Sequence, residues 1–288
     1  MSNRRMKSGD RKEGRLLHAI PSVSKVNAHM AADRVFYEEK FDVSAVERSL
    51  RRLRVAGYKD MKMFHFLIAA YVRVASMLPS VNRFVTGRET FAADDISVVL
   101  RLRRSENLEG SETKVKIHFQ PTDTIFDVYR RIDERMEDLR ASDEGNPIDE
   151  LMDTLGGMPR FVLRTALWFG RLLDYFGWLP EGVVEASPYH ASLIVHDAGS
   201  LDMAPSFRER SSIGYVPVEL SFGTRHHEYS LDRHGMMVDR KLVDCRFTMD
   251  GRALDERAQS KLMTGLRYIF RHPEIVESQP SRISEDVE

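Results

Sequence analysis

The sequence predicts an α/β protein built as a two-layer sandwich, in which helices pack on one mixed β-sheet. Amphipathic helical patterns dominate the first half of the chain, whereas hairpin-rich strand patterns dominate the part after Pro188. A regular strand–helix alternation, which would indicate a purely parallel sheet, is missing. With 288 residues, of which 42% are hydrophobic and 30% charged, the chain can bury a substantial core as a single domain.

The first half of the chain is predicted to hold three helices and three strands. Apolar residues recur every three or four positions in the helical segments, and the strand segments alternate or are rich in β-branched residues. The predicted helices are 44–54, 62–77 and 123–140, and the predicted strands are 35–42, 96–102 and 114–119. Asp42 or Ser44 caps the first helix, and Pro79 ends the second because proline cannot continue a helix.

The second half begins with a loop at 144–148 and an aromatic helix over 158–179. Arg160, Arg164 and Arg171 recur at helical spacing in this helix, and their charge prevents it from spanning a bilayer. Its apolar residues predict an amphipathic helix packed on the protein itself or on a neighbouring subunit, with an interfacial membrane helix as the alternative. The remaining elements are strands at 191–195, 215–222, 228–231 and 241–248, followed by a helix over 254–270.

Composition limits the partners and the compartment. The net charge of −1 indicates no nucleic-acid partner, and the single cysteine fits a reducing, cytoplasmic location. Residues 1–15 are predicted to be a disordered basic arm, with electrostatic tethering to RNA or anionic lipid as the alternative. Residues 16–277 form the predicted domain, and residues 278–288 a disordered tail. No apolar run follows the basic start, so a signal peptide is not expected.

Metal binding and thiol chemistry are not expected. His226, His227 and His234 cluster around a predicted hairpin with no carboxylate at helical spacing, so we interpret them as solvated loop histidines. Cys245 lies in an apolar strand and is predicted to be a buried, inert thiol. Neither a glycine-rich phosphate loop nor a serine nucleophile elbow is found in the sequence.

Three segments in a fixed order resemble a known family. They are VNRF at 81–84, ASLIVHDAGS at 191–200 and DCRFTMDGR at 244–252. Together they resemble the catalytic domain of the dihydrolipoyl acyltransferases of 2-oxo-acid dehydrogenase complexes, whose fold chloramphenicol acetyltransferase shares. The order of elements matches that family from about 35 to 276. The resemblance implies the CoA-dependent acyltransferase fold, with the aromatic helix as an insertion.

The resemblance also implies a reaction. The family signature is His-x-x-x-Asp-Gly, in which the histidine is the general base for attack on an acyl-CoA thioester and the aspartate braces the site. Asp250 and Gly251 match the signature, but Arg246 stands where the histidine is expected. If one residue is inserted, Cys245 takes that place instead. An arginine cannot act as a base near neutral pH, because its pKa exceeds about 12.

Two interpretations of this substitution remain open. In the first, His196 has become the base, and Arg246 holds a carboxylate, a phosphate or the oxyanion. In the second, His196 is an ordinary strand-end histidine, and Arg246 pairs with Asp244 or Asp250. Where relatives place an oxyanion-binding hydroxyl, this chain has His196 or Asp197, with two serines nearby, Ser192 and Ser200.

The resemblance implies coenzyme A or acyl-CoA as a substrate, a thiol, amine or hydroxyl acceptor on a small molecule or protein, and a homotrimer with sites between subunits. We find neither a lipoyl domain nor a subunit-binding domain in this sequence, so the chain, if catalytic, is expected to be a stand-alone acyltransferase. Neither a lipoyl attachment nor a metal is expected. Arg101, Arg103 and Arg104 are candidates for contacting CoA phosphates, although a solvated strand edge explains them equally well. The alternative function is an inactive trimeric binding or scaffold protein, which docks on a membrane or partner through the helix 159–179.

Overall fold

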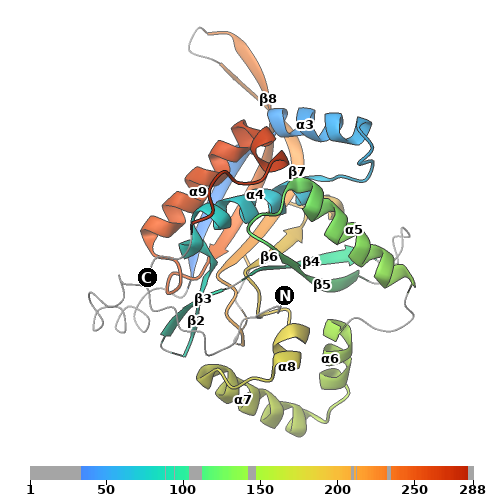
Figure 1. The fold of residues 1–288 in the computed structure, drawn as a ribbon, viewed down its shortest axis with the longest axis vertical. Helices are drawn as coiled ribbons and strands as arrows, with labels where there is room; N and C mark the ends of the chain where they lie inside the picture. Colours follow the sequence, from blue (N-terminus) through green and yellow to red (C-terminus); the bar gives the residue numbers. More distant parts are fainter. Residues whose placement is uncertain are drawn as a thin grey trace.

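The structure is a computed structural model that describes residues 34–284, except for 88, 94, 104–111, 142–146, 209–210, 212 and 232–234. Its described part contains a six-stranded sheet with strand order β1-β8-β7-β6-β4-β5 and a separate two-stranded hairpin, β2-β3 (Figure 1). β6 runs parallel to both of its neighbours, and the other pairs of the large sheet are antiparallel. The predicted α/β class with a mixed sheet is therefore confirmed.

The strand bounds follow the period-two patterns of the sequence. The large sheet consists of β1 (Val35–Asp42), β4 (Ile96–Arg103), β5 (Glu112–Phe119), β6 (Leu193–Asp197), β7 (Val218–Leu231) and β8 (Met237–Met249). The small hairpin consists of β2 (Arg83–Thr86) and β3 (Glu89–Ala92), which the sequence analysis did not predict. Because successive side chains of a strand point to opposite faces, each strand of the large sheet contributes to two different environments.

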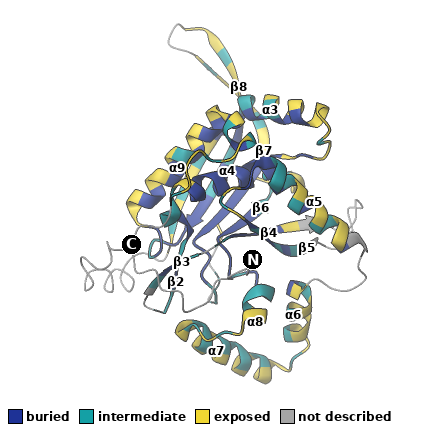
Figure 2. Cartoon of the chain, viewed as in Figure 1, coloured by how far each residue is buried: buried dark blue, intermediate teal, exposed yellow. Residues whose placement is uncertain are grey.

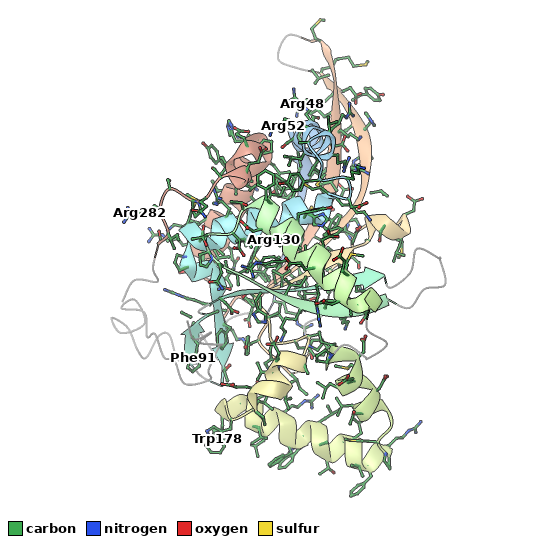
Figure 3. All side chains as sticks on the ribbon, turned by 45° about the vertical axis from the view of Figure 1, so that its right-hand side comes forward. Arg48, Arg52, Phe91, Arg130, Trp178 and Arg282 are labelled. Carbon is green, nitrogen blue, oxygen red and sulfur yellow. The ribbon has the colours of Figure 1, made fainter. Side chains whose placement is uncertain are left out.

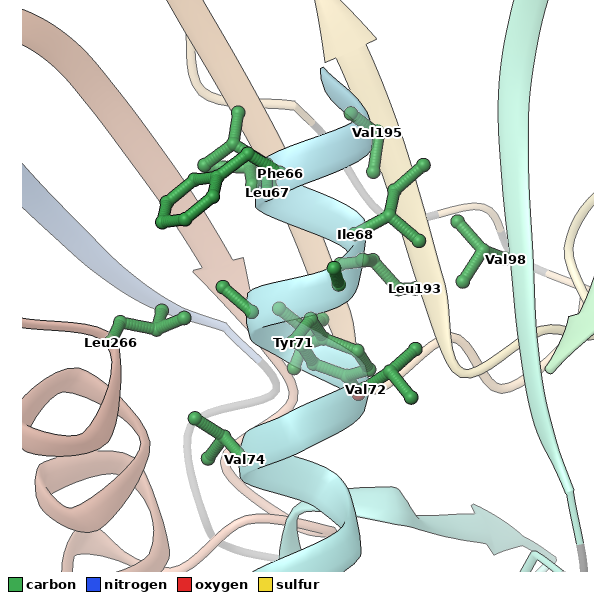
Figure 4. Packing of buried hydrophobic residues seen from close by; sticks show 14 of the residues in the cluster. Phe66, Leu67, Ile68, Tyr71, Val72, Val74, Val98, Leu193, Val195 and Leu266 are labelled. Atoms are coloured by element: carbon green, nitrogen blue, oxygen red, sulfur yellow. The ribbon is translucent and has the colours of Figure 1, made fainter. Parts of the chain in front are cut away.

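Helices cover one face of the large sheet and form the core with it. They are α3 (Ser44–Val55), α4 (Met63–Met77), α5 (Ile125–Ala141) and α9 (Glu256–Arg271). α4 is buried along nearly its whole length, since it lies between the sheet and the other helices. Its Ile68 points toward Val98 of β4 and Val195 of β6 (Figure 4). Burial of these apolar side chains is the main force that fixes the helices on this face.

β7 and β8 form one long hairpin, part of which extends beyond the rest of the sheet (Figure 1). The strands predicted separately at 215–222 and 228–231 are a single strand, because a bulge between Phe222 and Arg225 restores the pairing after the interruption. His226 and His227 therefore lie on β7 and not in a loop, whereas His234 lies outside the described residues.

The predicted aromatic helix is one of three helices in an insertion that precedes β6. These are α6 (Pro147–Gly156), α7 (Arg160–Phe176) and α8 (Glu181–Ala186). The loop expected at 144–148 is helical from Pro147 onward. α6 contacts both β5 and α8, and α7 contacts β2 at the far end of the molecule from the β7–β8 hairpin (Figure 1). None of the residues of α7 is buried.

The chain ends are described only in part. The predicted arm at 1–15 lies outside the described residues. The predicted tail is described from 278 to 284, where the Ser284 N–H donates to the Ser76 carbonyl at 3.0 Å. Among the helices that the structure describes, none combines the length and the apolarity that crossing a bilayer requires.

Candidate functional site

Two candidate residues, His196 and Arg246, lie in one row with Ser221 across three neighbouring strands. The strand register places His196 of β6 opposite Ser221 of β7, and Ser221 opposite Arg246 of β8. Glu38 of β1 continues the row opposite Arg246. All four lie on the face that points away from α3, α4, α5 and α9, because the alternating positions of these strands fill the core. Neighbouring strands are about 4.8 Å apart, so the backbones of His196 and Arg246 are separated by about 10 Å.

Arg246 is held by β1 and by an aromatic ring. Its Nη2 donates to Glu38 Oε1 at 3.2 Å, and its guanidinium lies 5.1 Å from the centre of the Phe207 ring. One of the two open interpretations paired Arg246 with Asp244 or Asp250, whereas the ion pair found for Arg246 is with Glu38. Arg246 is also about one-third exposed, so its guanidinium remains accessible to an anion.

Strand alternation places Cys245 on the core face of the sheet and Arg246 on the opposite face. The Cys245 side chain is completely buried in the core, and burial raises the pKa of its thiol well above the ordinary value. Arg246, on the next position of β8, therefore occupies the face where His196 and Ser221 lie. The prediction of a buried thiol at Cys245 agrees with this geometry.

His196 lies at the edge of a large cavity. Its Nε2 is 3.4 Å from Glu219 Oε2, and the imidazole and the carboxylate are both mostly shielded from solvent. Glu219 is on β7, two positions before Ser221, so it shares the face of the row. The cavity of about 510 Å³ opens beside the carboxyl ends of the parallel strands β4 and β6. Small-molecule sites of α/β proteins commonly lie at such strand ends.

The cavity has an apolar wall and several polar groups. Its apolar lining comes mainly from α4, α5 and the segment after β6: Phe64, Leu100, Ile132, Met136, Val195, Leu201 and Met203. Its polar lining includes His65, Lys62 and Arg208, together with the predicted Arg101 and His196. Arg104 and the side chain of Arg103 lie outside the described residues.

The sequence analysis did not identify His65, which has a defined protonation state. Burial lowers the pKa of His65 to about 3, so the imidazole is neutral at physiological pH. The Lys62 N–H donates to its Nδ1 at 2.8 Å, which leaves the ring proton on Nε2. His65 is therefore a fixed donor at the cavity wall. The apolar pattern of α4 indicated only that this part of the helix packs in the core. The cavity is formed by several elements that are distant in the sequence, so nothing in the sequence indicates that His65 lines it.

A loop after β6 covers the row. The Ser206 N–H lies 3.4 Å from Ser221 Oγ, and the Arg208 N–H lies 3.4 Å from Thr248 Oγ1. Phe207, between them, packs edge-on against Phe36 of β1 at 5.1 Å. The loop thus connects β7, β8 and β1 on this face. The sequence analysis did not predict these contacts, because the segment has neither a helical nor a strand pattern.

Asp250 is a structural brace at the end of β8. Its carboxylate accepts from Arg252 Nε at 3.0 Å and from Arg252 Nη2 at 2.8 Å, and it is almost completely buried. The Asp250 N–H also donates to the Pro217 carbonyl at 2.9 Å, beside the start of β7. This arrangement connects the end of β8 to the start of β7, and it places Asp250 outside the row of His196 and Arg246.

A second polar cluster joins the insertion to the sheet. His118 of β5 lies between Asp95 and Glu185, with 3.0 Å from its Nε2 to Glu185 Oε1. His190 lies 3.1 Å from Asp174 of α7 through Nε2, in the buried part of the cluster. Within the described ranges, no group of three or more His, Cys, Asp or Glu side chains is arranged to hold a metal ion.

The fold matches that of solved acyltransferase structures with the chloramphenicol acetyltransferase-like fold. A probable dihydrolipoamide acetyltransferase from Listeria monocytogenes superposes with a TM-score of 0.58 at 14% identity, over 92% of this chain and 96% of that chain. The dihydrolipoamide acetyltransferase of Azotobacter vinelandii gives 0.57 at 11% identity, over 91% of each chain. Chloramphenicol acetyltransferase gives 0.53 at 12% identity, over 86% of this chain and 94% of that chain.

The comparisons with sequences give no matches. No protein-family model matches the chain, and no curated protein matches it. At 11–14% identity to the solved structures, the shared feature is the fold. The resemblance that the three sequence segments indicate is thereby confirmed at the level of the fold, and the reaction is a separate question.

Proposed function

We propose that this protein transfers an acyl group from acyl-CoA to a thiol, amine or hydroxyl acceptor, with His196 as the base in place of the family histidine. Arg246 stabilises the developing negative charge or a substrate anion, and Asp250 braces the site. The observation that carries the proposal is the position of His196, Ser221 and Arg246 in one row, with His196 at the cavity.

Ser221, between His196 and Arg246, is buried under the loop after β6, so the proposal requires that loop to move before a thioester can lie between them. The main chains of His196 and Arg246 are about 10 Å apart, and an arginine side chain spans more than half of that distance. In the proposed tautomer, His196 Nε2–H donates to the Glu219 carboxylate, which orients the ring and leaves the Nδ1 lone pair as the base. A base oriented by a carboxylate in this way is a recurring arrangement in enzymes of acyl transfer.

The proposed reaction balances without any further reactant. His196 takes the proton from the acceptor X–H, and X forms a bond to the thioester carbonyl carbon. The carbonyl oxygen becomes an oxyanion, which Arg246 stabilises. The C–S bond then breaks, and His196 returns the proton to the sulfur. The products are the acylated acceptor and free CoA.

The cavity wall carries both signs of charge: Lys62, Arg101 and Arg208 lie there, and so do Asp60, Asp133 and Asp197. We propose the arginines as the groups that contact the CoA phosphates, because arginine recognises phosphate through paired N–H donors. We include a homotrimer in the proposal, because the family that the sequence resembles builds its sites between subunits. A partially exposed Arg246 and an exposed Phe36 on the same face are compatible with a subunit that packs there.

The alternative is a binding or scaffold protein that keeps the fold without catalysis. Arg246 supports this reading, since it replaces a base by a group that stays protonated. Its contacts with Glu38 and Phe207 are stabilising contacts of an ordinary structural arginine. The two functions differ in whether acyl-CoA binds and turns over, and this difference defines the experiment.

The first measurement is calorimetric titration of the purified protein with CoA and acetyl-CoA, with its oligomeric mass measured by light scattering. Acyltransferase function predicts micromolar binding, about −8 kcal/mol. Release of free CoA is then followed with dihydrolipoamide and a panel of amines and alcohols as acceptors. His196→Gln should slow turnover by roughly 100- to 10,000-fold. His272→Gln, an exposed histidine on the helix side, is the matched control.

The possible outcomes separate the two functions. Absence of binding at millimolar CoA overturns the acyltransferase proposal, as does turnover that His196→Gln leaves unchanged. Turnover that appears only in the Arg246→His variant shows that the native chain has lost the reaction, and supports the scaffold. A monomeric mass overturns the homotrimer.

A further inference from the structure

α7 exposes an aromatic stripe at the extremity of the molecule. Figure 2 shows that most of its surface faces solvent, and Figure 3 shows Trp178 just beyond its end. The exposed fractions are 79% for Phe161, 63% for Trp168, 52% for Phe169, 52% for Phe176 and 69% for Trp178. A large exposed apolar patch of this kind marks a surface that binds something.

The end of the stripe is rigid. Gly177 has φ +68° and ends α7 in the left-handed conformation, and the Trp178 N–H returns to the Leu173 carbonyl at 2.8 Å. The rings of Phe176 and Trp178 stack at 5.1 Å. Trp178 is therefore held in line with the aromatic residues of the helix, and the stripe continues past the end of α7.

Arginines follow one side of the stripe. At 100° per residue, Arg160, Arg164 and Arg171 fall within an arc of about 40°, and all three side chains are exposed. The only acidic residue between 160 and 176 is Asp174. Its carboxylate faces the domain, where it contacts His190 and accepts the Gly214 N–H at 2.9 Å. The outer face of α7 thus combines apolar, aromatic and basic groups without a carboxylate.

We propose that α7 binds the surface of an anionic membrane, lying in the interface with its aromatic stripe among the acyl chains and its arginines at the lipid phosphates. The composition of the face is that of interfacial helices, with Trp and Phe on the apolar side and basic residues beside them. The charge of the arginines is complementary to anionic headgroups, which attract basic residues near the surface. This inference goes beyond acyl transfer and does not depend on it.

A second copy of the chain fits this surface less well. Two α7 helices placed face to face would bury the aromatic rings, but would bring Arg160 and Arg164 of one helix near a face that contains no carboxylate. A buried or half-buried cation without a partner is costly. Lipid phosphates supply the missing charge, whereas a second α7 does not.

The tryptophans give the experiment a direct readout. The chain contains two tryptophans, Trp168 and Trp178, and both belong to the proposed surface. Insertion into the interface should shift their emission to the blue, and brominated phosphatidylcholine should quench it. The full-length protein is titrated with phosphatidylcholine vesicles that contain phosphatidylglycerol, and with vesicles of phosphatidylcholine alone. Cosedimentation measures the bound fraction in parallel.

Two double variants separate charge from apolar contact without removing the fluorophores. Arg160→Glu with Arg164→Glu should weaken binding to the anionic vesicles by about 25-fold or more. Phe161→Ser with Phe169→Ser should weaken binding and diminish the blue shift. Arg51→Glu with Arg257→Glu makes the same change of charge at exposed positions of α3 and α9. This control should leave binding to the anionic vesicles unchanged. Circular dichroism checks that each variant keeps its helices.

We expect the protein to bind anionic vesicles more weakly as the salt concentration rises. Bromolipid should quench its tryptophan fluorescence, and both α7 variants should bind the vesicles more weakly than the wild type. Equal binding to both kinds of vesicle overturns the proposal, and so does a fluorescence change without bromolipid quenching. If the protein instead self-associates through α7, with a mass that falls in the phenylalanine variant and no vesicle binding, the surface is a protein interface and the proposal is wrong.

Discussion

His118 connects the sheet to the insertion through two carboxylates from different parts of the chain. Asp95 precedes β4, Glu185 belongs to α8, and both contact the imidazole. Burial lowers the pKa of His118, but the hydrogen bonds and charges of Asp95 and Glu185 outweigh it and raise the pKa to about 9. Replacement of His118 by glutamine should therefore destabilise the protein in a pH-dependent way.

The sign and the size of this effect follow from the shift. Because the pKa of His118 is raised from 6.5 in the unfolded chain, the stabilisation is complete below pH 6.5 and is lost as the pH rises through about 9. The full shift corresponds to about 3 kcal/mol. The side chain is 35% exposed, so solvent screening reduces the expected contribution to about 1–2 kcal/mol.

Urea unfolding of the wild type and His118→Gln between pH 6.5 and pH 9 measures this difference. The comparison between the two proteins is needed because Lys116 acts in the opposite direction: burial lowers its pKa to about 8, so its deprotonation stabilises the fold as the pH rises. His227→Gln is the control, because the His227–Asp239 pair lies on the exposed hairpin. Its loss should change the free energy of unfolding only slightly. A stability difference for His118→Gln that stays constant over this pH range would refute the reasoning.

Three further predictions concern stability and reactivity. Gly214→Ala should lower the free energy of unfolding by about 2 kcal/mol or more, because Gly214 has φ +90° and an added Cβ would lie 2.0 Å from the Tyr189 carbonyl oxygen; an unchanged melting temperature would contradict this. Asp250→Asn should cost about 3–5 kcal/mol in chemical denaturation, since it leaves the guanidinium of Arg252 without its buried partner; a loss below about 1 kcal/mol would argue against the brace. Cys245 should resist thiol reagents until the protein unfolds, because burial raises the pKa of its thiol; rapid labelling of the native protein would disprove that.

Most elements of the sandwich follow from local patterns. The strand at 35–42 has the predicted bounds, and α4 covers nearly all of the predicted 62–77. Both elements are predicted by the periodicity of apolar residues within one short segment, so contacts with distant residues are not needed to predict them. The errors arise where long-range pairing decides. β7 continues past Gly223 because β8 pairs with it on both sides of the bulge, although the local sequence indicates two strands.

The candidate site was predicted only in part. His196, Arg246 and Asp250 were identified from a resemblance of segments, but Glu38, Glu219 and the loop around Phe207 were not. Glu38 and Glu219 come from other strands, and a register shift of one residue would turn either side chain to the opposite face of the sheet. The position of the Phe207 loop depends on its packing against these strands. The same geometry decides that Arg246, and not Cys245, shares the face of His196.

The sequence by itself determined the α/β class, the order of helices and strands, and the basic and aromatic composition of the helix at 160–176, whereas its exposure to solvent comes from the structure. These properties depend on residues close together in the chain, whose periodicity sets which side chains share a face. Only the tertiary structure decided that His196 and Arg246 lie in one row, and that Asp174 turns inward while the arginines of α7 face solvent. Those relations depend on strand register and on packing between distant segments, which no local pattern encodes.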